Sequence, residues 1–471
     1  MLFTSLPFLI FFVVCYLIYW RIGTRVARQW FLVAASLFFY GWWDFRFVAL
    51  MLFVAVVAYL GALGISRCRN QERRRLILIT SLIAHLGVLF FFKYFNFFMD
   101  SLQGVAALLG SAAQLPAWHV ILPVGISFYT FHAISYTVDV YRAVVRPDYS
   151  FREVLLYIAF FPQLVAGPII RSSFFMPQLR SDRQRCDERL AAGLRLFLIG
   201  FFYKAVIADT LAVIADQVFA DPQRWSTLGL WGGALAYYGQ IYFDFNGYTT
   251  MAIGIAWFFG YRLPDNFNFP YSARNIADFW HRWHMSLSTW LRDYLYVPLG
   301  GNRYGIRLQY RNLMLTMLLG GLWHGASWNF VIWGGLHGLA LIVHKQWIMW
   351  TGERKGTAWG LVPSLLLTQL WVLVAWVFFR SQSLDDSLTM LRGMAGIGVG
   401  SGQETMPPWV LPAIVLPVIA DAVLGRLQAA APGSWELRLG WPAYAGFTGI
   451  AAALFLWLVP LTSAPFIYFQ F

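Results

Sequence analysis

Charge and cysteine are both scarce in this sequence. Only 12% of its 471 residues are charged, about half the share in soluble globular proteins, whereas 59% are hydrophobic. So few charges cannot cover a water-facing surface of this size, which excludes a soluble enzyme, a disordered chain and a coiled coil. The three cysteines, Cys15, Cys68 and Cys186, lie far apart with no C-x-x-C pair, which excludes a disulfide scaffold and a thiolate metal site. The sequence predicts a multi-spanning membrane protein.

Lysine is also rare, so the net charge of +13 comes almost entirely from arginine. Short basic loops between spans are the expected positive-inside bias, and we therefore expect no nucleic-acid partner. One basic loop carries Arg21, Arg25 and Arg28, and the next carries five arginines between residues 67 and 75. Two apolar segments separate these loops, which places both on the cytoplasmic side. The N-terminus is then predicted to be extracytoplasmic, and residues 6–20 form a retained first helix because no basic region precedes them.

Apolar segments recur along the whole chain, and a spanning helix needs about 20 such residues. The candidates are residues 6–20, 30–43, 47–65, 76–98, 121–140, 190–208, 228–243, 312–323, 328–350, 362–379, 408–424 and 441–461. Residues 154–170 and 247–261 are shorter and are expected to be re-entrant, and residues 381–408 form a surface loop. We predict an all-α polytopic membrane protein with about 11–13 membrane-embedded helices in a single domain, residues 1–471.

The polar chemistry is concentrated in residues 263–311, where Asn, Arg, His and Asp alternate with aromatic residues. Residues 275–297 have the periodicity of an amphipathic helix, with an i,i+4 pair of Asp278 and Arg282 on its polar side. Its apolar side consists of Trp280, Trp283, Leu287, Trp290, Leu291 and Tyr294. Such a helix is too polar to span alone. It either anchors at the membrane interface or lines a polar cavity.

A second motif, GGLWHGASWN at residues 320–329, places His324 in an apolar run beside glycines. An ionisable residue in a membrane segment favours a functional role, although a histidine bonded to a backbone carbonyl is the structural alternative. His281, His284 and His324 would suit a metal site or acid–base chemistry. The sequence contains no H-E-x-x-H, G-x-S-x-G, Walker or G-x-G-x-x-G motif, which favours acid–base chemistry without metal or ATP. His85, His119, His132, His337 and His344 are expected to be structural.

Together these motifs resemble the membrane-bound O-acyltransferase family, and within it the membrane subunits of bacterial alginate and cellulose O-acetylation. The matching segments are DNFNFPY (residues 265–271), FWHRWHMSLSTWLRDYLY (279–296), LGGNR (299–303), GGLWHGA (320–326), LPVGISFYTFHAISYTVDVYR (122–142), FPQLVAGP (161–168) and PFIYFQF (465–471). Each motif alone is weak, but together they run from one end of the chain to the other.

The resemblance implies a helical fold with a central polar cavity, and acyl transfer centred on His324. It implies His284 as the second active-site residue. His281 stands where the family usually has arginine, so no catalytic role is expected for it. The family's F-S-G-Y-S-D-M-A appears here as FNGYTTMA at residues 245–252, without the acidic residue, which puts any acceptor contact by that acid in doubt.

The predicted roles follow from this resemblance. His324 would be the general base on the acceptor hydroxyl or the group that first meets the acyl chain, and His284 would orient the thioester or stabilise the oxyanion. The expected substrate-binding residues are Asn266, Asn268, Arg282, Ser286, Ser288, Arg292, Asp293, Trp323 and Asn329. Acetyl-CoA is the expected donor, with no bound cofactor.

The resemblance also implies a setting. The acceptor would lie within an exopolysaccharide O-acetylation system of the bacterial inner membrane, reached through a periplasmic acetyl-accepting transferase. Two alternatives from other classes are a transporter or flippase and a non-catalytic scaffold of a polysaccharide-modifying complex. A transporter should show two related halves, and no internal repeat is visible.

Overall fold

The computed structural model describes residues 1–110, 120–352, 358–397 and 404–406, together with residues 411, 412, 415, 418 and 419. Over these residues the chain is helical, and its β-structure is a single isolated bridge between Trp225 and Glu404. The all-α prediction is therefore confirmed. The chain divides into two compact units: residues 1–197 with 252–264, and residues 198–251 with 265–471.

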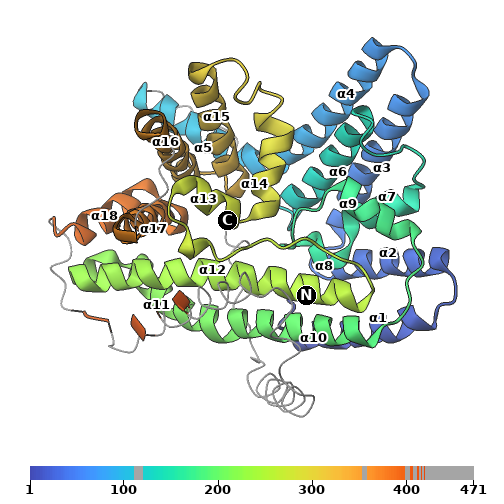
Figure 1. Ribbon diagram of the computed structural model, residues 1–471, viewed down its shortest axis with the longest axis horizontal. Coiled ribbons are helices and arrows are strands. Elements are labelled where there is room, and N and C mark those ends of the chain that lie inside the picture. The colour runs from blue at the N-terminus through green and yellow to red at the C-terminus, as the bar shows by residue number, and fades with distance from the viewer. Residues whose placement is uncertain are drawn as a thin grey trace. The chain divides into compact units, whose positions relative to one another are not determined.

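The first unit contains the helices of the N-terminal half (Figure 1). They are α1 (Leu6–Arg21), α2 (Arg25–Gly41), α3 (Arg46–Arg67), α4 (Gln71–Leu89), the π-helix η1 (Phe90–Tyr94), α5 (Phe95–Leu108), α6 (Ile126–Tyr141), α7 (Phe151–Ala159), α8 (Phe161–Leu164), α9 (Ser172–Arg180) and most of α10 (Asp187–Phe201). Side-chain caps define several of the starts. The Ser5 hydroxyl accepts from the Phe8 amide, and Ser150 forms a capping box with Glu153.

The second unit contains the helices that follow. They are the π-helix η2 (Phe202–Ala208), α11 (Asp209–Ala220), the 3₁₀ turn η3 (Pro222–Arg224), most of α12 (Thr227–Phe258), the 3₁₀ turn η4 (Pro270–Ser272), α13 (Ile276–Arg282), α14 (Met285–Leu291), the π-helix η5 (Arg292–Tyr296), α15 (Ile306–His324), α16 (Trp328–Thr351), α17 (Ala358–Arg380) and α18 (Leu384–Met394). The helices α10 and α12 each have residues in both units.

Four helical stretches among the described residues are long and apolar enough to cross a membrane: Arg46–Arg67, Gln71–Leu108, Asp187–Ala220 and Val362–Arg380. All four coincide with predicted spans, and the shorter apolar helix Leu6–Arg21 coincides with a fifth. The predicted span at residues 441–461, most of the span at 408–424, and the motif at 465–471 lie outside the described residues.

Two predictions about segmentation are wrong. The segments at residues 228–243 and 247–261 are not separate, because α12 runs through both as one helix of 32 residues. Asp244, Phe245 and Asn246, the residues between them, do not interrupt it. The predicted surface loop at 381–408 contains α18, which starts at a capping box formed by Ser383 and Asp386.

Glycines let α15 and α16 pack closely within the second unit. A Cβ atom at Gly334 would collide with the Met317 carbonyl oxygen, and one at Gly321 would collide with that of Phe330. These two helices therefore approach backbone to backbone on either side of the turn that carries His324. This agrees with the close approach that small residues allow in membrane helix pairs.

Gly334→Ala is expected to destabilise the protein by about 1–3 kcal/mol, because the added methyl group must push α15 and α16 apart. The neighbouring Gly335→Ala is the matched control. Its Cβ would meet only Leu318 Cδ2 at 3.6 Å, an ordinary contact, so it should be neutral or slightly stabilising. The thermal midpoint of the two detergent-solubilised variants measures the difference. Equal shifts would show that the close approach does not limit stability.

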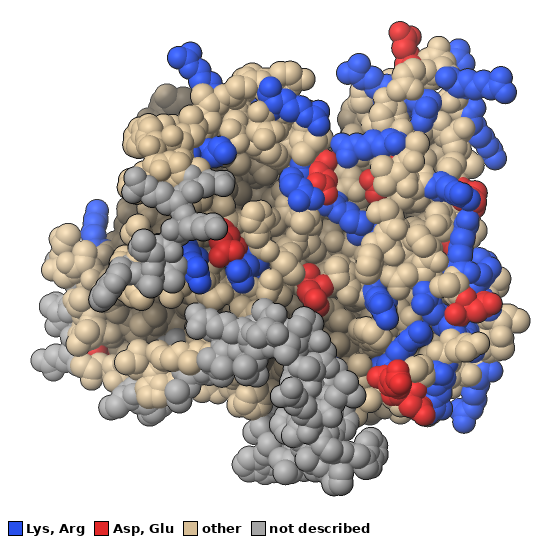
Figure 2. All heavy atoms as spheres, viewed as in Figure 1, with Lys and Arg blue, Asp and Glu red and all other residues tan. Residues whose placement is uncertain are grey.

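Basic side chains are unevenly distributed between the units. The first unit carries more than half of all Lys and Arg residues but fewer than half of the Asp and Glu residues. Figure 2 shows many of them over the surface formed by α3, α4, α6 and α7. This unit contains both of the basic loops from which the cytoplasmic side was predicted.

Candidate active site

His324 is the last residue of α15 and lies at a tight turn. Gly325 follows in an extended conformation, and a Cβ atom there would collide with the Phe330 ring. The His324 side chain is 4% exposed, and its ring packs against Trp333 and Phe379 with centroid distances of 5.0 and 5.2 Å. The turn therefore holds a buried imidazole among aromatic side chains.

His284 lies at a break that the sequence periodicity did not indicate. The predicted single helix at residues 275–297 is wrong, because α13 ends at Arg282, α14 begins at Met285, and η5 continues from Arg292. His284 itself adopts a left-handed backbone with φ 42° and ψ 52°. A histidine in this region is uncommon and costs about 1–3 kcal/mol, and such strain is concentrated at functional sites.

The segment before α13 holds this break in place. The Asn266 side-chain oxygen accepts from the Ser286 amide at 3.2 Å and from its hydroxyl at 2.8 Å. Two backbone hydrogen bonds join the same residues: the Met285 amide donates to the Asn266 carbonyl, and the Asn268 amide donates to the Arg282 carbonyl, both at 2.9 Å. Residues on both sides of His284 are therefore hydrogen-bonded to one segment, residues 266–268. These bonds stabilise the left-handed backbone of His284.

The structure brings the two histidines together although 39 residues separate them in the chain. Their ring centroids lie 6.1 Å apart, and Trp323 contacts both rings. Two imidazoles this close can both contact one small substrate. Both rings are in the second unit.

His284, like His85 and His337, is buried with neither ring nitrogen hydrogen-bonded in the described part of the chain. Burial lowers the pKa of His284 to about 3. A neutral imidazole keeps one N–H donor, and here that donor is not used by the protein. Unsatisfied buried polar atoms of this kind need an explanation, and a bound substrate would supply one.

The other predicted site residues fall into three groups. Trp323, Asn266 and Ser286 are buried and lie beside the histidines in the contacts described above. Arg282 forms the predicted i,i+4 ion pair with Asp278 at 2.7 Å, which is confirmed, and Arg292 pairs with the adjacent Asp293.

The remaining three differ in their surroundings. Asn268 is exposed and Ser288 is half-buried. Asn329 is buried, and its amide nitrogen donates to the carbonyl oxygens of Ser381 and Ser383. These bonds tie the start of α16 to the turn before α18.

The surroundings of the remaining histidines vary. His281 is exposed, whereas His284 is buried, which argues against the i,i+3 metal-binding pair that the sequence left as an alternative. No group of three or more His, Cys, Asp or Glu side chains in the described ranges could hold a metal ion. His337 packs between Phe279 and Trp333. His132 accepts from the Ile170 amide at 3.1 Å, a structural role.

Sequence reasoning missed a buried ion cluster in the second unit. The Lys204 ammonium lies 2.6 Å from Asp209 and 2.9 Å from Asp244. Lys204 and Asp244 are 4% and 2% exposed. A signal was present, because Lys204 is the one lysine within the apolar run at residues 190–208.

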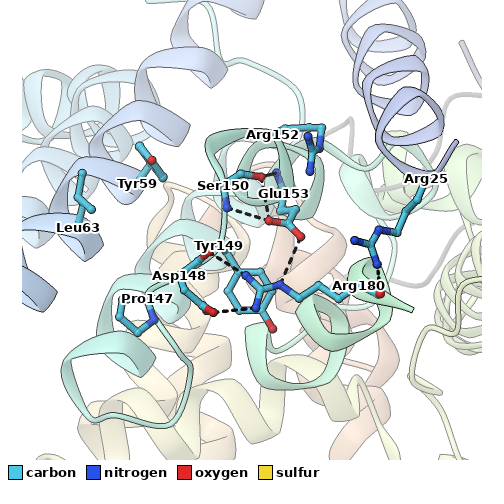
Figure 3. A pocket seen from close by; sticks show the side chains of 10 residues that line it. All are labelled: Arg25, Tyr59, Leu63, Pro147, Asp148, Tyr149, Ser150, Arg152, Glu153 and Arg180. Carbon is cyan, nitrogen blue, oxygen red and sulfur yellow. Dashed lines mark hydrogen bonds and ion pairs between the residues drawn. The ribbon is translucent and has the colours of Figure 1, made fainter. Parts of the chain in front are cut away.

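A pocket in the first unit, of about 590 Å³, is lined by Arg25, Arg152, Arg180, Asp148 and Glu153, among others (Figure 3). Arg180 forms ion pairs with both carboxylates, at 2.9 Å to Asp148 and 3.5 Å to Glu153. Its hydrogen bond holds the pKa of the Asp148 carboxyl below the usual value. The pocket is thus largely neutralised by its own ion pairs.

Comparisons with known proteins show which family the chain matches. The model of the MBOAT, membrane-bound O-acyltransferase family matches residues 37–380, which include both histidines. The chain is 42% identical over 392 residues to "Peptidoglycan O-acetyltransferase" of Helicobacter pylori, covering 78% of this chain and 73% of that protein. It is 42% identical over 410 residues to "Probable alginate O-acetylase AlgI" of Pseudomonas aeruginosa, covering 84% and 75%. A more distant relative, 28% identical over 279 residues, is "Teichoic acid D-alanyltransferase" of Bacillus subtilis, covering 57% and 71%.

These relatives are all named as enzymes that transfer an acyl group. The matched region, the apolar helices and the resemblance of the motifs point to one conclusion. The chain is a multi-pass membrane acyltransferase and belongs to the membrane-bound O-acyltransferase family.

Proposed function

We propose that this protein transfers an acetyl group from cytoplasmic acetyl-CoA to an acceptor hydroxyl on the extracytoplasmic side of the bacterial inner membrane, through a central polar cavity in a single membrane domain. The observation that carries the proposal is the pair of buried imidazoles, His284 and His324, with ring centroids 6.1 Å apart. The 42% identity to an enzyme named as a peptidoglycan O-acetyltransferase supports acetyl as the acyl group.

In this mechanism His324 acts as the general base. It takes the proton of the acceptor hydroxyl while the hydroxyl oxygen forms a bond to the thioester carbonyl carbon. The carbon–sulfur bond then breaks, and the protonated His324 returns the proton to the departing thiolate, so no other co-reactant is needed. The N–H of neutral His284 stabilises the oxyanion that develops on the carbonyl oxygen, a contribution of roughly 3–4 kcal/mol for a good donor.

The acceptor belongs to an exopolysaccharide O-acetylation system, and a periplasmic transferase takes the acetyl group and completes its delivery. The relatives named as alginate O-acetylases, at 40–42% identity, support this setting. Asn266, Asn268, Arg282, Ser286, Ser288, Arg292, Asp293, Trp323 and Asn329 contribute to substrate binding in this proposal. The basic loops of the first unit face the cytoplasm, which leaves the N-terminus extracytoplasmic.

The test uses the purified protein in liposomes with acetyl-CoA labelled in the acetyl group. Transfer of label is followed to alginate oligosaccharides, to peptidoglycan fragments and to a purified periplasmic transferase, each added outside vesicles loaded with the donor. Label on one of these acceptors supports the proposal and identifies the acceptor. If labelled acetyl-CoA is not consumed with any acceptor while a longer acyl-CoA or another activated acyl group is, the acetyl assignment is wrong.

The pH dependence of turnover tests the state of His284. Because its pKa of about 3 lies below the assay range, its ring stays neutral from pH 5 to pH 8. The kcat profiles of the wild type and of His284→Asn are therefore expected to run parallel over this range, at different heights. An acid limb that is present in the wild type and absent in the variant would show that His284 takes up a proton in this range.

A further inference from the structure

The ion cluster of the second unit lies beside the candidate site and has no part in the mechanism above. Lys204 projects from η2 and bridges Asp209, on the following helix, and Asp244 in α12. Lys204 belongs to a helical stretch, Asp187–Ala220, that is apolar enough to cross a membrane. Charged groups buried in such a stretch are expensive and are retained chiefly where they serve a function.

The backbone around Lys204 is also specialised. η2 is a π-helix, and turns of this kind are frequent at functional sites. Next to it, a Cβ atom at Gly247 of α12 would lie 2.7 Å from the Gly200 carbonyl oxygen and 2.9 Å from the Lys204 amide nitrogen. The two backbones are therefore in direct contact at the position of the ion pair. The backbone contact and the ion pair together determine the position of this part of α12 along η2.

The residue after Asp244 connects this contact to the site. The Phe245 ring is fully buried and lies edge-to-face against the His284 ring, with centroids 4.7 Å apart. It also packs against Phe267, whose neighbour Asn266 holds the break at His284. Because no hydrogen bond in the described part of the chain orients the His284 ring, packing alone determines its direction. Phe245 is the closest of the aromatic rings in contact with it.

We propose that Lys204 and Asp244 are positioning residues for acyl transfer. Their buried ion pair sets the position of α12 and so holds Phe245 against His284. This contact orients the His284 ring toward the reacting carbonyl oxygen. This inference rests on the proposed function, because it assigns the pair a role in the same reaction. It adds two residues that touch neither histidine in the contacts described and that the sequence motifs did not indicate.

Asp244→Asn is the variant of choice. It keeps the size of the side chain, and Lys204 retains Asp209 at 2.6 Å, so no unpaired ammonium is left buried. We expect kcat to fall by about 10–100-fold with an unchanged KM, since a small misplacement of a catalytic group costs up to about 10²-fold. Phe245→Leu is the second variant. It leaves the ion pair intact, removes the ring contact, and should lower kcat by a similar factor.

The deciding measurement is a double-mutant cycle with His284→Asn. If the pair acts through His284, adding Asp244→Asn or Phe245→Leu to His284→Asn should lower kcat less than threefold further. A merely structural role predicts that the factors multiply, and that result would overturn the inference. Arg224→Gln is the matched control. It breaks an exposed ion pair of the same unit, Arg224 with Glu404, and should leave kcat unchanged.

A readout that does not depend on activity separates this inference from the proposed function. In protein labelled with ¹⁵N-histidine, the His284 ring signals are assigned by their loss in His284→Asn. They should shift in Asp244→Asn and in Phe245→Leu but not in Arg224→Gln. Unshifted signals would contradict the inference even if acetyl transfer is confirmed. If the signals shift but the protein does not transfer acetyl groups, the contact from Asp244 to His284 is supported and the proposed function is wrong.

Discussion

His324→Gln lowers the rate of acetyl transfer by about 10²–10⁴-fold while the protein remains folded, if this imidazole is the general base. Glutamine has a similar volume and can form hydrogen bonds, but it cannot take up a proton. The loss should therefore appear in kcat, with little change in KM, because the donor and the acceptor still bind. The measurement is the transfer of label from acetyl-CoA in liposomes, with the thermal midpoint recorded as the test of folding.

The control for this prediction is His337→Gln. His337 is a fully buried histidine of the same unit, packed against Phe279 and Trp280, and no chemical role is assigned to it. Its substitution is expected to lower the thermal midpoint without a comparable loss of kcat. Equal losses of kcat in the two variants would assign the effect of His324 to packing rather than to proton transfer.

His284→Asn is expected to lower kcat by about 10²–10³-fold, the loss typical for removal of one oxyanion donor. Asparagine is the informative substitution, because it is among the residues that most readily adopt the left-handed backbone observed at this position. The fold of the α13–α14 break is thereby kept while the imidazole is removed. Steady-state acetyl transfer and the thermal midpoint are measured on the same preparations.

His281→Asn is the matched control, three residues away and exposed. It should leave both kcat and the thermal midpoint unchanged. Full activity of His284→Asn would remove His284 from the mechanism. A fall in the thermal midpoint that parallels the loss of activity would instead point to a structural role for His284 at the break.

The membrane class and most helices were predictable because they depend on local properties. A run of apolar residues such as 47–65 must be removed from water wherever it lies, and α3 forms over Arg46–Arg67 accordingly. The boundary near His324 was similarly predictable, since separate apolar segments were expected at 312–323 and 328–350, and α15 ends at His324 while α16 begins at Trp328. Local patterns failed at residues 244–246, which were expected to separate two segments but lie inside α12.

The break at His284 could not be seen in the sequence for a physical reason. The apolar residues Trp280, Trp283, Leu287 and Trp290 keep helical spacing through it, so periodicity alone predicts one continuous helix. All four are indeed buried, which confirms the predicted apolar side. What interrupts the helix is the hydrogen bonding of Asn266 to Ser286, a contact between residues 20 apart.

Composition, apolar runs and the motifs around His284 and His324 were enough to determine a helical membrane protein and to nominate its two principal histidines. Only the tertiary structure decided that these rings lie 6.1 Å apart, and that Lys204 meets Asp244 40 residues away. The physical reason is that residue spacing determines which face of a helix is apolar, whereas a contact between two distant side chains depends on the packing of several helices against one another. Function depends on such contacts, because catalysis requires groups held in fixed positions relative to one another.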